Sequence, residues 1–172
     1  MKVDQADLAI IAEQIGREPQ GIVRVAARAN NGCPQVLQMR SIVDNKPFPT
    51  LYWLCGKSIS KAIGAIETQG WVKDVEQRLQ EDEGLREAFL ANQHQYVAKR
   101  KAEMHPDDAA LIEQRGMTDL FASYGIGGIA QWDKVRCLHM QYAHHLVDGN
   151  AIGELLDSEF NLREILSRAD AR

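Results

Sequence analysis

The order of apolar and polar residues along the chain predicts a few short strands early in the sequence and helices later. Residues 22–28, 36–43 and 48–54 are short segments rich in β-branched and aromatic residues, which is typical of strands. Asn31-Gly32 lies between the first two segments and favours a tight turn, because both residues adopt positive φ at little cost. The sequence therefore predicts an antiparallel hairpin followed by a third strand.

Apolar residues at helical spacing mark most of the remaining chain. Asp4 is placed to cap a first helix that ends near Ile15, because Gly16 is a natural stop. Further helices are expected at 58–70, 71–103 with a break near 82–84, 107–114, 134–147 and 160–168. Early strands and late helices favour an α+β fold over a wound parallel sheet. We expect a small antiparallel sheet of about three N-terminal strands, packed with about five to seven helices, in a single domain spanning residues 1–172.

Composition narrows the classes of function. The chain has 172 residues, with 20 Lys and Arg against 24 Asp and Glu, so its net charge is −4. This balance does not suggest a general polyanion binder, and we expect no nucleic acid partner. There is no apolar run of the roughly 20 residues that a membrane-spanning helix needs, and the first residues lack the apolar core of a signal peptide. We therefore expect no membrane partner and a cytoplasmic location, where thiols stay reduced.

The three cysteines are the main candidates for chemistry. Their odd number argues against a disulfide framework. Cys33 lies in the expected hairpin turn, Cys55 at the end of the third strand, and Cys137 near the start of a helix. Loops give access to a thiol and helix N-termini stabilise a thiolate, so such positions suit metal ligands or nucleophiles. The competing interpretation is that all three are small buried hydrophobic side chains.

Several motifs together resemble one bacterial family, catalogued as domain of unknown function 501. They occur in the same order as in that family, and the resemblance covers about Asp7 to Leu156. The motifs are GREPQG at 16–21, PFPTLYWLC at 47–55, GIGGI at 125–129, VRCLH at 135–139 and Ala143-His144. The resemblance implies a cytoplasmic bacterial protein without an established activity. It also implies a gene neighbourhood that includes a septum protein of cell division and a polyphosphate-type phosphatase.

The leading hypothesis is a metal centre, in a protein that acts on a small-molecule substrate. Cys33, Cys55 and Cys137 are its expected ligands, and three thiolates with an open fourth position suit an iron–sulfur cluster or a zinc ion. His144 lies within about 20° of Cys137 on the expected helix and is expected to face the substrate, together with Arg136. His139 joins this site only if Cys137 precedes the regular helix.

Two alternatives stay open. The first is a metal-free thiol enzyme, in which Cys137 or Cys55 is the nucleophile and a histidine is the base. The second is a non-enzymatic interaction module linked to cell division. The metal hypothesis depends on the fold bringing positions 33, 55 and 137 into one pocket.

Overall fold

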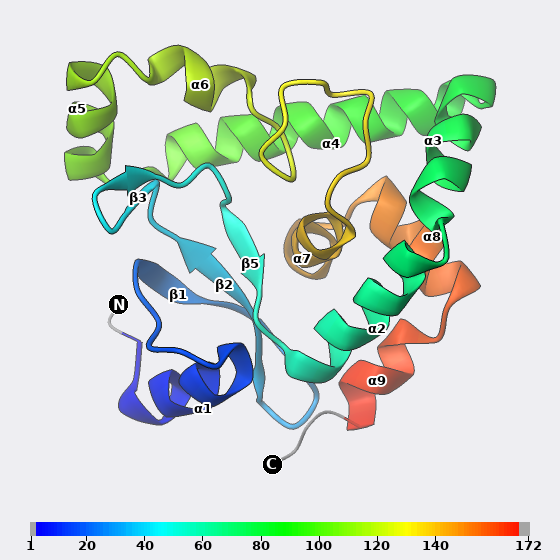
Figure 1. Cartoon of the computed structure of the whole chain (residues 1–172), viewed down its shortest axis with the longest axis horizontal. Coiled ribbons are helices and arrows are strands. Elements are labelled where there is room, and N and C mark those ends of the chain that lie inside the picture. Colours follow the sequence, from blue (N-terminus) through cyan, green and yellow to red (C-terminus); the bar gives the residue numbers. More distant parts are fainter. Residues whose placement is uncertain (1–2, 169–172) are drawn as a thin grey trace.

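The structure is a computed structural model that describes residues 3–168. Five strands and nine helices form within these residues (Figure 1). The strands are β1 (Ile22–Arg28), β2 (Pro34–Met39), β3 (Ile42–Val43), β4 (Lys46–Pro47) and β5 (Tyr52–Leu54). The helices are α1 (Gln5–Ile15), α2 (Lys57–Thr68), α3 (Trp71–Glu81), α4 (Glu83–Ala102), α5 (Pro106–Gln114), α6 (Thr118–Ser123), α7 (Leu138–Asp148), α8 (Ala151–Glu159) and α9 (Leu162–Arg168).

The main sheet has three strands in the order β1-β2-β5, and both pairings are antiparallel. Val25 pairs with Leu37 across the hairpin, and Val36 pairs with Leu54 on the other side of β2. A separate ribbon of β3 and β4 turns at Asp44-Asn45, where both residues have positive φ. The expected hairpin and third strand are confirmed, and so is the α+β fold class.

Side chains alternate between the two faces of this sheet, as the pleat of a strand requires. Tyr52 and Leu54 of β5 belong to the large core formed with the later helices. Trp53 and Cys55 belong to a smaller core on the other face, where Ile11 of α1 packs. Figure 1 shows α1 on one side of the sheet and α2 and α7 on the other. The sheet therefore separates two apolar clusters.

Helix α7 is the centre of the larger core and is seen almost end-on in Figure 1. It packs against β5, α2 and α8, and Leu138, Tyr142 and Ala143 are fully buried. The long helix α4 crosses above it and is tied to the strand region, because the Tyr96 hydroxyl accepts the Leu51 N–H at 2.7 Å. These contacts hold α7 against β5, α2 and α8 in the middle of the larger core.

The structure differs from the sequence expectations in several elements. Helices α6 and α8 were not expected, since both are short and lack a long periodic pattern. The expected strand 36–43 ends at Met39, because the chain bends before β3. The expected helix 134–147 begins later, at Leu138, since the preceding Val135 N–H donates to Glu76 Oε1 at 3.0 Å. An extended segment therefore leads into α7.

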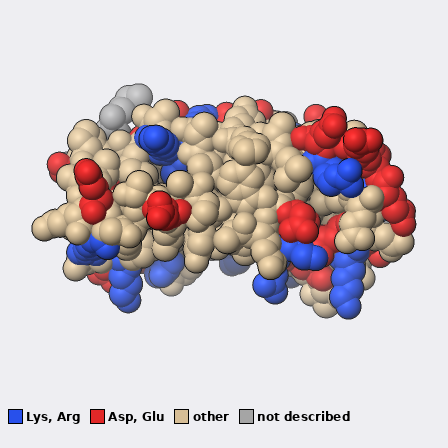
Figure 2. Space-filling view, turned by 90° about the horizontal axis from the view of Figure 1, so that it is seen from above, with Lys and Arg blue, Asp and Glu red and all other residues tan. Residues whose placement is uncertain are grey.

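Charge is unevenly distributed over the surface. Acidic side chains gather at the end of the molecule formed by α3 and the start of α4, while the middle of the same face carries few charges (Figure 2). Lysines and arginines on this face stand singly or in small groups. Between residues 3 and 168, no helix combines the length and the apolar character needed to cross a bilayer.

The loop before α7 depends on Gly127. Its φ is +85°, and a Cβ there would lie 1.8 Å from the Arg136 carbonyl oxygen. We expect Gly127→Ala to lower the free energy of unfolding by about 3 kcal/mol, because positive φ and a backbone clash add. Urea unfolding followed by circular dichroism measures this change.

Gly116 provides the matched control, since its φ is +69° but no atom lies within 4 Å of an added Cβ. Gly116→Ala should cost about 1 kcal/mol, the conformational penalty alone. Equal losses in the two variants would contradict the role given to the contact between Gly127 and Arg136.

Candidate metal centre

Cys137 stands just before the regular part of α7. It is the N-cap residue of that helix, with φ −86° and ψ 148°, which is extended backbone. The glycine loop holds the preceding peptide in place, because Gly127 lies against the Arg136 carbonyl and Ile126 N–H donates to Gln93 Oε1 at 2.7 Å. Cys137 therefore precedes the helix, which is the condition under which His139 can join it.

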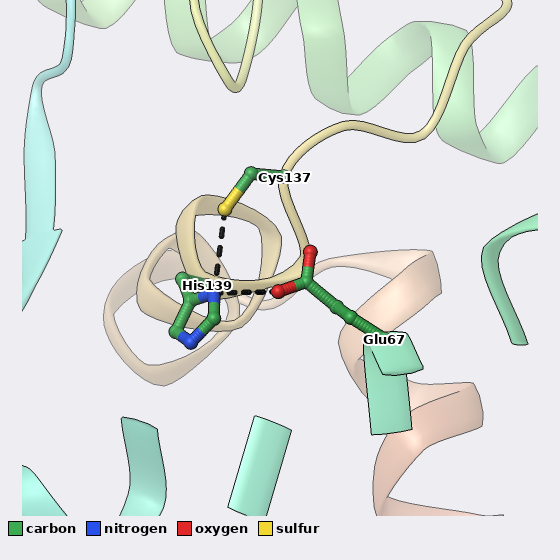
Figure 3. Close-up of side chains that lie close together, drawn as sticks. All are labelled: Glu67, Cys137 and His139. Atoms are coloured by element: carbon green, nitrogen blue, oxygen red, sulfur yellow. Dashed lines mark hydrogen bonds and ion pairs between the residues drawn. The ribbon is translucent and has the colours of Figure 1, made fainter. Parts of the chain in front are cut away.

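His139 and Glu67 complete a three-residue cluster with Cys137 (Figure 3). His139 Nδ1 lies 3.4 Å from Cys137 Sγ and 2.9 Å from Glu67 Oε1. Glu67 comes from the last turn of α2, and its other oxygen accepts the Leu138 N–H at 3.3 Å. The side chains of His139 and Glu67 are 25% and 30% exposed, so small solutes can reach them.

The second ring nitrogen of His139 fixes its tautomer. Nε2 lies 3.0 Å from the Ser60 carbonyl oxygen, which can only accept, so Nε2 carries a proton. Nδ1 then holds a lone pair in the neutral ring and a second proton in the imidazolium. The pKa of His139 is raised, first by its hydrogen bond to Cys137, against the opposing effect of burial, with the charges of Cys137 and Glu67 adding to it. The protonated ring is a cation between Cys137 and Glu67, whereas the neutral ring has a lone pair on Nδ1 that can bind a metal ion.

The three ligand atoms lie within 4.8 Å of one another, and no other such group of His, Cys, Asp or Glu occurs between residues 3 and 168. Zinc bonds of 2.0–2.3 Å in a tetrahedron place ligand atoms roughly 3.5 Å apart. The 3.4 Å and 2.9 Å separations around His139 Nδ1 are close to that spacing. Small side-chain movements would bring all three atoms around one ion.

Cys33 and Cys55 lie in a different place, beside α1. Cys33 Sγ donates to Gln14 Oε1 at 3.4 Å, and the amide nitrogen of the same Gln14 is 4.0 Å from Cys55 Sγ. Both thiols also contact the Pro34 carbonyl oxygen. Burial, with a smaller contribution from Cys33, raises the pKa of Cys55 to about 12. Because the sheet lies between Cys55 and α7, the structure does not gather the three cysteines into one pocket.

His144 is also apart from the cluster, in the core behind β5. It is 0% exposed, and its ring lies between Tyr52 and Tyr96. Asn150 Oδ1 accepts the Gly153 N–H, so the Asn150 amide nitrogen is the atom that donates to His144 Nδ1 at 3.1 Å. This bond keeps the ring neutral with its proton on Nε2. Burial is the main cause that lowers the pKa of His144 to about 4.

The remaining site residue expected from sequence, Arg136, is exposed. It directly precedes Cys137, and its side chain makes no hydrogen bond or ion pair within the described part of the chain. Glu67 was missed altogether, because it lies on a distant helix and no spacing links it to Cys137. His139 could be anticipated from the sequence, because it reaches Cys137 if Cys137 precedes the regular helix.

Comparison with known proteins identifies the family of this chain. The family model described as "Protein of unknown function (DUF501)" matches residues 25–158. The chain belongs to the DUF501 family. The DUF501 match includes Glu67, Cys137 and His139, whereas α1 with Gln14 precedes it. No curated protein and no solved structure matches the sequence.

His144 predicts a pH dependence of stability. Its pKa is about 4 in the folded chain against an ordinary 6.5, so between these values the unfolded chain binds the extra proton. Stability is fully present above pH 6.5 and falls as the pH drops toward 4, by about 3 kcal/mol from this group. Urea unfolding at pH 7.5 and 4.5 measures the loss.

His144→Gln should flatten this dependence, because it removes the group that binds the extra proton in the unfolded chain. Titration of the His144 ring by NMR provides a second measurement that does not need the variant to fold. A midpoint near 6.5 would refute the assignment of a neutral buried ring.

Proposed function

We propose that this protein binds one zinc ion through Cys137 Sγ, His139 Nδ1 and Glu67 Oε1, and acts there on a small-molecule substrate. The observation that carries the proposal is the meeting of these three ligand atoms within 4.8 Å. Three protein ligands leave a fourth position for water or substrate, which is the usual arrangement of catalytic zinc. Partial exposure of His139 and Glu67 keeps that position accessible.

The donor set favours zinc over an iron–sulfur cluster. Clusters are held chiefly by several cysteine thiolates, and here a single thiol meets an imidazole and a carboxylate. Sulfur, nitrogen and oxygen are all ordinary zinc ligands. Cys33 and Cys55, which lie beside α1, have no part in this proposal.

The surroundings of the cluster orient it for metal binding. A histidine ligand commonly donates its other ring N–H to a backbone carbonyl, which is what His139 does with Ser60 at 3.0 Å. Glu67 is held by the Leu138 N–H, so its second oxygen stays directed at His139. The site therefore needs little rearrangement to accept an ion.

A zinc ion at this position supplies activation of a bound water or polarisation of a carbonyl group. Arg136 is the residue we assign to the substrate, because it is exposed beside Cys137 and has no partner among residues 3–168. A guanidinium suits a carboxylate or phosphate group. His144 is left out of the mechanism, because it is fully buried and neutral. A cytoplasmic location would keep the Cys137 thiol reduced.

Zinc titration by calorimetry tests the proposal. We expect one equivalent to bind at pH 7.5, and Cys137→Ser or His139→Gln to weaken binding at least about 100-fold, since each removes a ligand. Binding should weaken as the pH falls, because protons compete for Nδ1 of His139, whose pKa is raised.

Cys33→Ala is the matched control and should leave zinc affinity unchanged. An equal loss in that variant would instead support a centre shared among the three cysteines. Absence of stoichiometric zinc from titration and from elemental analysis would refute zinc binding at Cys137.

The 3.4 Å contact between Cys137 Sγ and His139 Nδ1 also favours a second candidate, a metal-free thiol nucleophile. In this case His139 takes the proton of Cys137 and remains beside the thiolate. Cys137 is half-buried, whereas Cys33 and Cys55 are buried, so it is the most accessible of the three thiols.

We expect iodoacetamide to alkylate Cys137 of the folded protein at least about 10-fold faster than the other two cysteines, and His139→Gln to slow this reaction. Peptide mass spectrometry identifies the alkylated residue. Protection of Cys137 by added zinc would distinguish the metal centre from the metal-free enzyme. Faster labelling of Cys55 than of Cys137 in the zinc-free protein would contradict the thiol nucleophile.

A further inference from the structure

A hollow of about 580 Å³ lies between α4, α5 and α6, away from the residues of the metal centre. Its walls are largely apolar and include Met104 and Phe121. Three lining positions, Ala98, Ala109 and Ala122, carry alanines that are exposed. The hollow is open because these side chains are small, and its size is that of an ordinary ligand pocket.

The walls of the hollow are firmly held. Arg40 forms two hydrogen bonds with the Asp108 carboxylate, at 2.8 and 2.7 Å, and the Ser41 N–H adds a third at 3.1 Å. These bonds attach α5 to the chain segment after β2. Phe121 of α6 is buried against α4, where it lies beside the Arg100 guanidinium. The hollow is therefore preformed and does not depend on a mobile wall.

A buried cation forms part of the lining. Arg100 is 1% exposed, and its guanidinium donates to the carbonyl oxygens of Pro49, Phe121 and Tyr124. No carboxylate pairs with it among residues 3–168, and its Nε has no hydrogen-bond partner. The guanidinium thus has carbonyl oxygens and the rings of Tyr96 and Phe121 around it, but no carboxylate among residues 3–168, so its positive charge is not neutralised beside the hollow.

Two further charges line the hollow, Lys101 on α4 and Glu113 on α5. Both are exposed, and neither forms an ion pair within the described part of the chain. With Arg100, the hollow has two positive groups and one negative group. An apolar surface with a net positive charge fits a ligand that has an apolar body and a single anionic group.

We propose that this hollow binds a free fatty carboxylate of medium chain length. The alkyl chain lies along the apolar walls, and the carboxylate pairs with the Lys101 ammonium, close to the buried charge of Arg100. The two binding sites share no residue, so this proposal stands or falls independently of zinc.

Calorimetric titration with decanoate, below its micelle concentration, tests the proposal. We expect saturable sub-millimolar binding of one decanoate, and several-fold weaker binding of decanol, which has the same chain and no charge. Ala109→Phe fills the hollow from α5 and should weaken decanoate at least about 10-fold. Its matched control is Ala110→Phe, at the neighbouring exposed position that does not line the hollow.

Lys101→Gln should weaken decanoate several-fold and leave decanol unchanged, whereas Lys61→Gln, on another exposed surface, should change neither. Cys137→Ser should bind decanoate normally, which separates this site from the metal centre. Equal affinity for decanol and decanoate, an Ala109→Phe variant that binds as well as the parent, or binding only at millimolar concentration would each overturn the proposal. So would dimers in sedimentation that Ala109→Phe abolishes, because a second copy would then occupy the hollow.

Discussion

The alternation of side chains along β5 is the constraint from which the rest of the structure follows. Tyr52 and Leu54 enter the large core with α7, whereas Trp53 and the residue just after the strand, Cys55, enter the small core with α1. A strand cannot present two successive residues to the same face. The same three-residue strand therefore anchors the central helix and keeps Cys55 away from Cys137.

The candidate metal centre depends on how α7 begins. If the helix started at Lys134, Cys137 and His139 would point to different sides of it, since neighbours two apart do not face each other. The extended Cys137 at the N-cap removes that restriction and lets Sγ approach His139 Nδ1. Glu67 binds both the first N–H of α7 and His139, so one carboxylate joins the helix terminus to the site. Its position at the helix N-terminus also suits a negative charge.

Two buried basic side chains illustrate different solutions to the cost of burial. His144 is kept neutral, with its Nδ1 occupied by Asn150, and so avoids bringing a charge into the core. Arg100 cannot lose its charge. Its guanidinium instead donates hydrogen bonds to carbonyl oxygens at the end of α6, where the helix dipole is negative. Of these two side chains, Arg100 keeps a charge that no carboxylate among residues 3–168 pairs with, and it lies beside the hollow between α4, α5 and α6.

The sequence alone determined the local elements of this protein: the hairpin, the third strand, the Asp4-capped first helix and the α+β class follow from turn residues, capping residues and apolar spacing. It also identified Cys137 as a candidate, and the family motif around it. Only the tertiary structure decided what surrounds that thiol, because Glu67 and Ser60 come from a helix far along the chain. The start of α7 was likewise decided by long-range contacts with Glu76 and Gly127, which override the local helical pattern. The spacing of residues in the sequence indicates which of them share a helix or strand. A functional site depends on which helices and strands are in contact in the folded chain, and spacing does not show this.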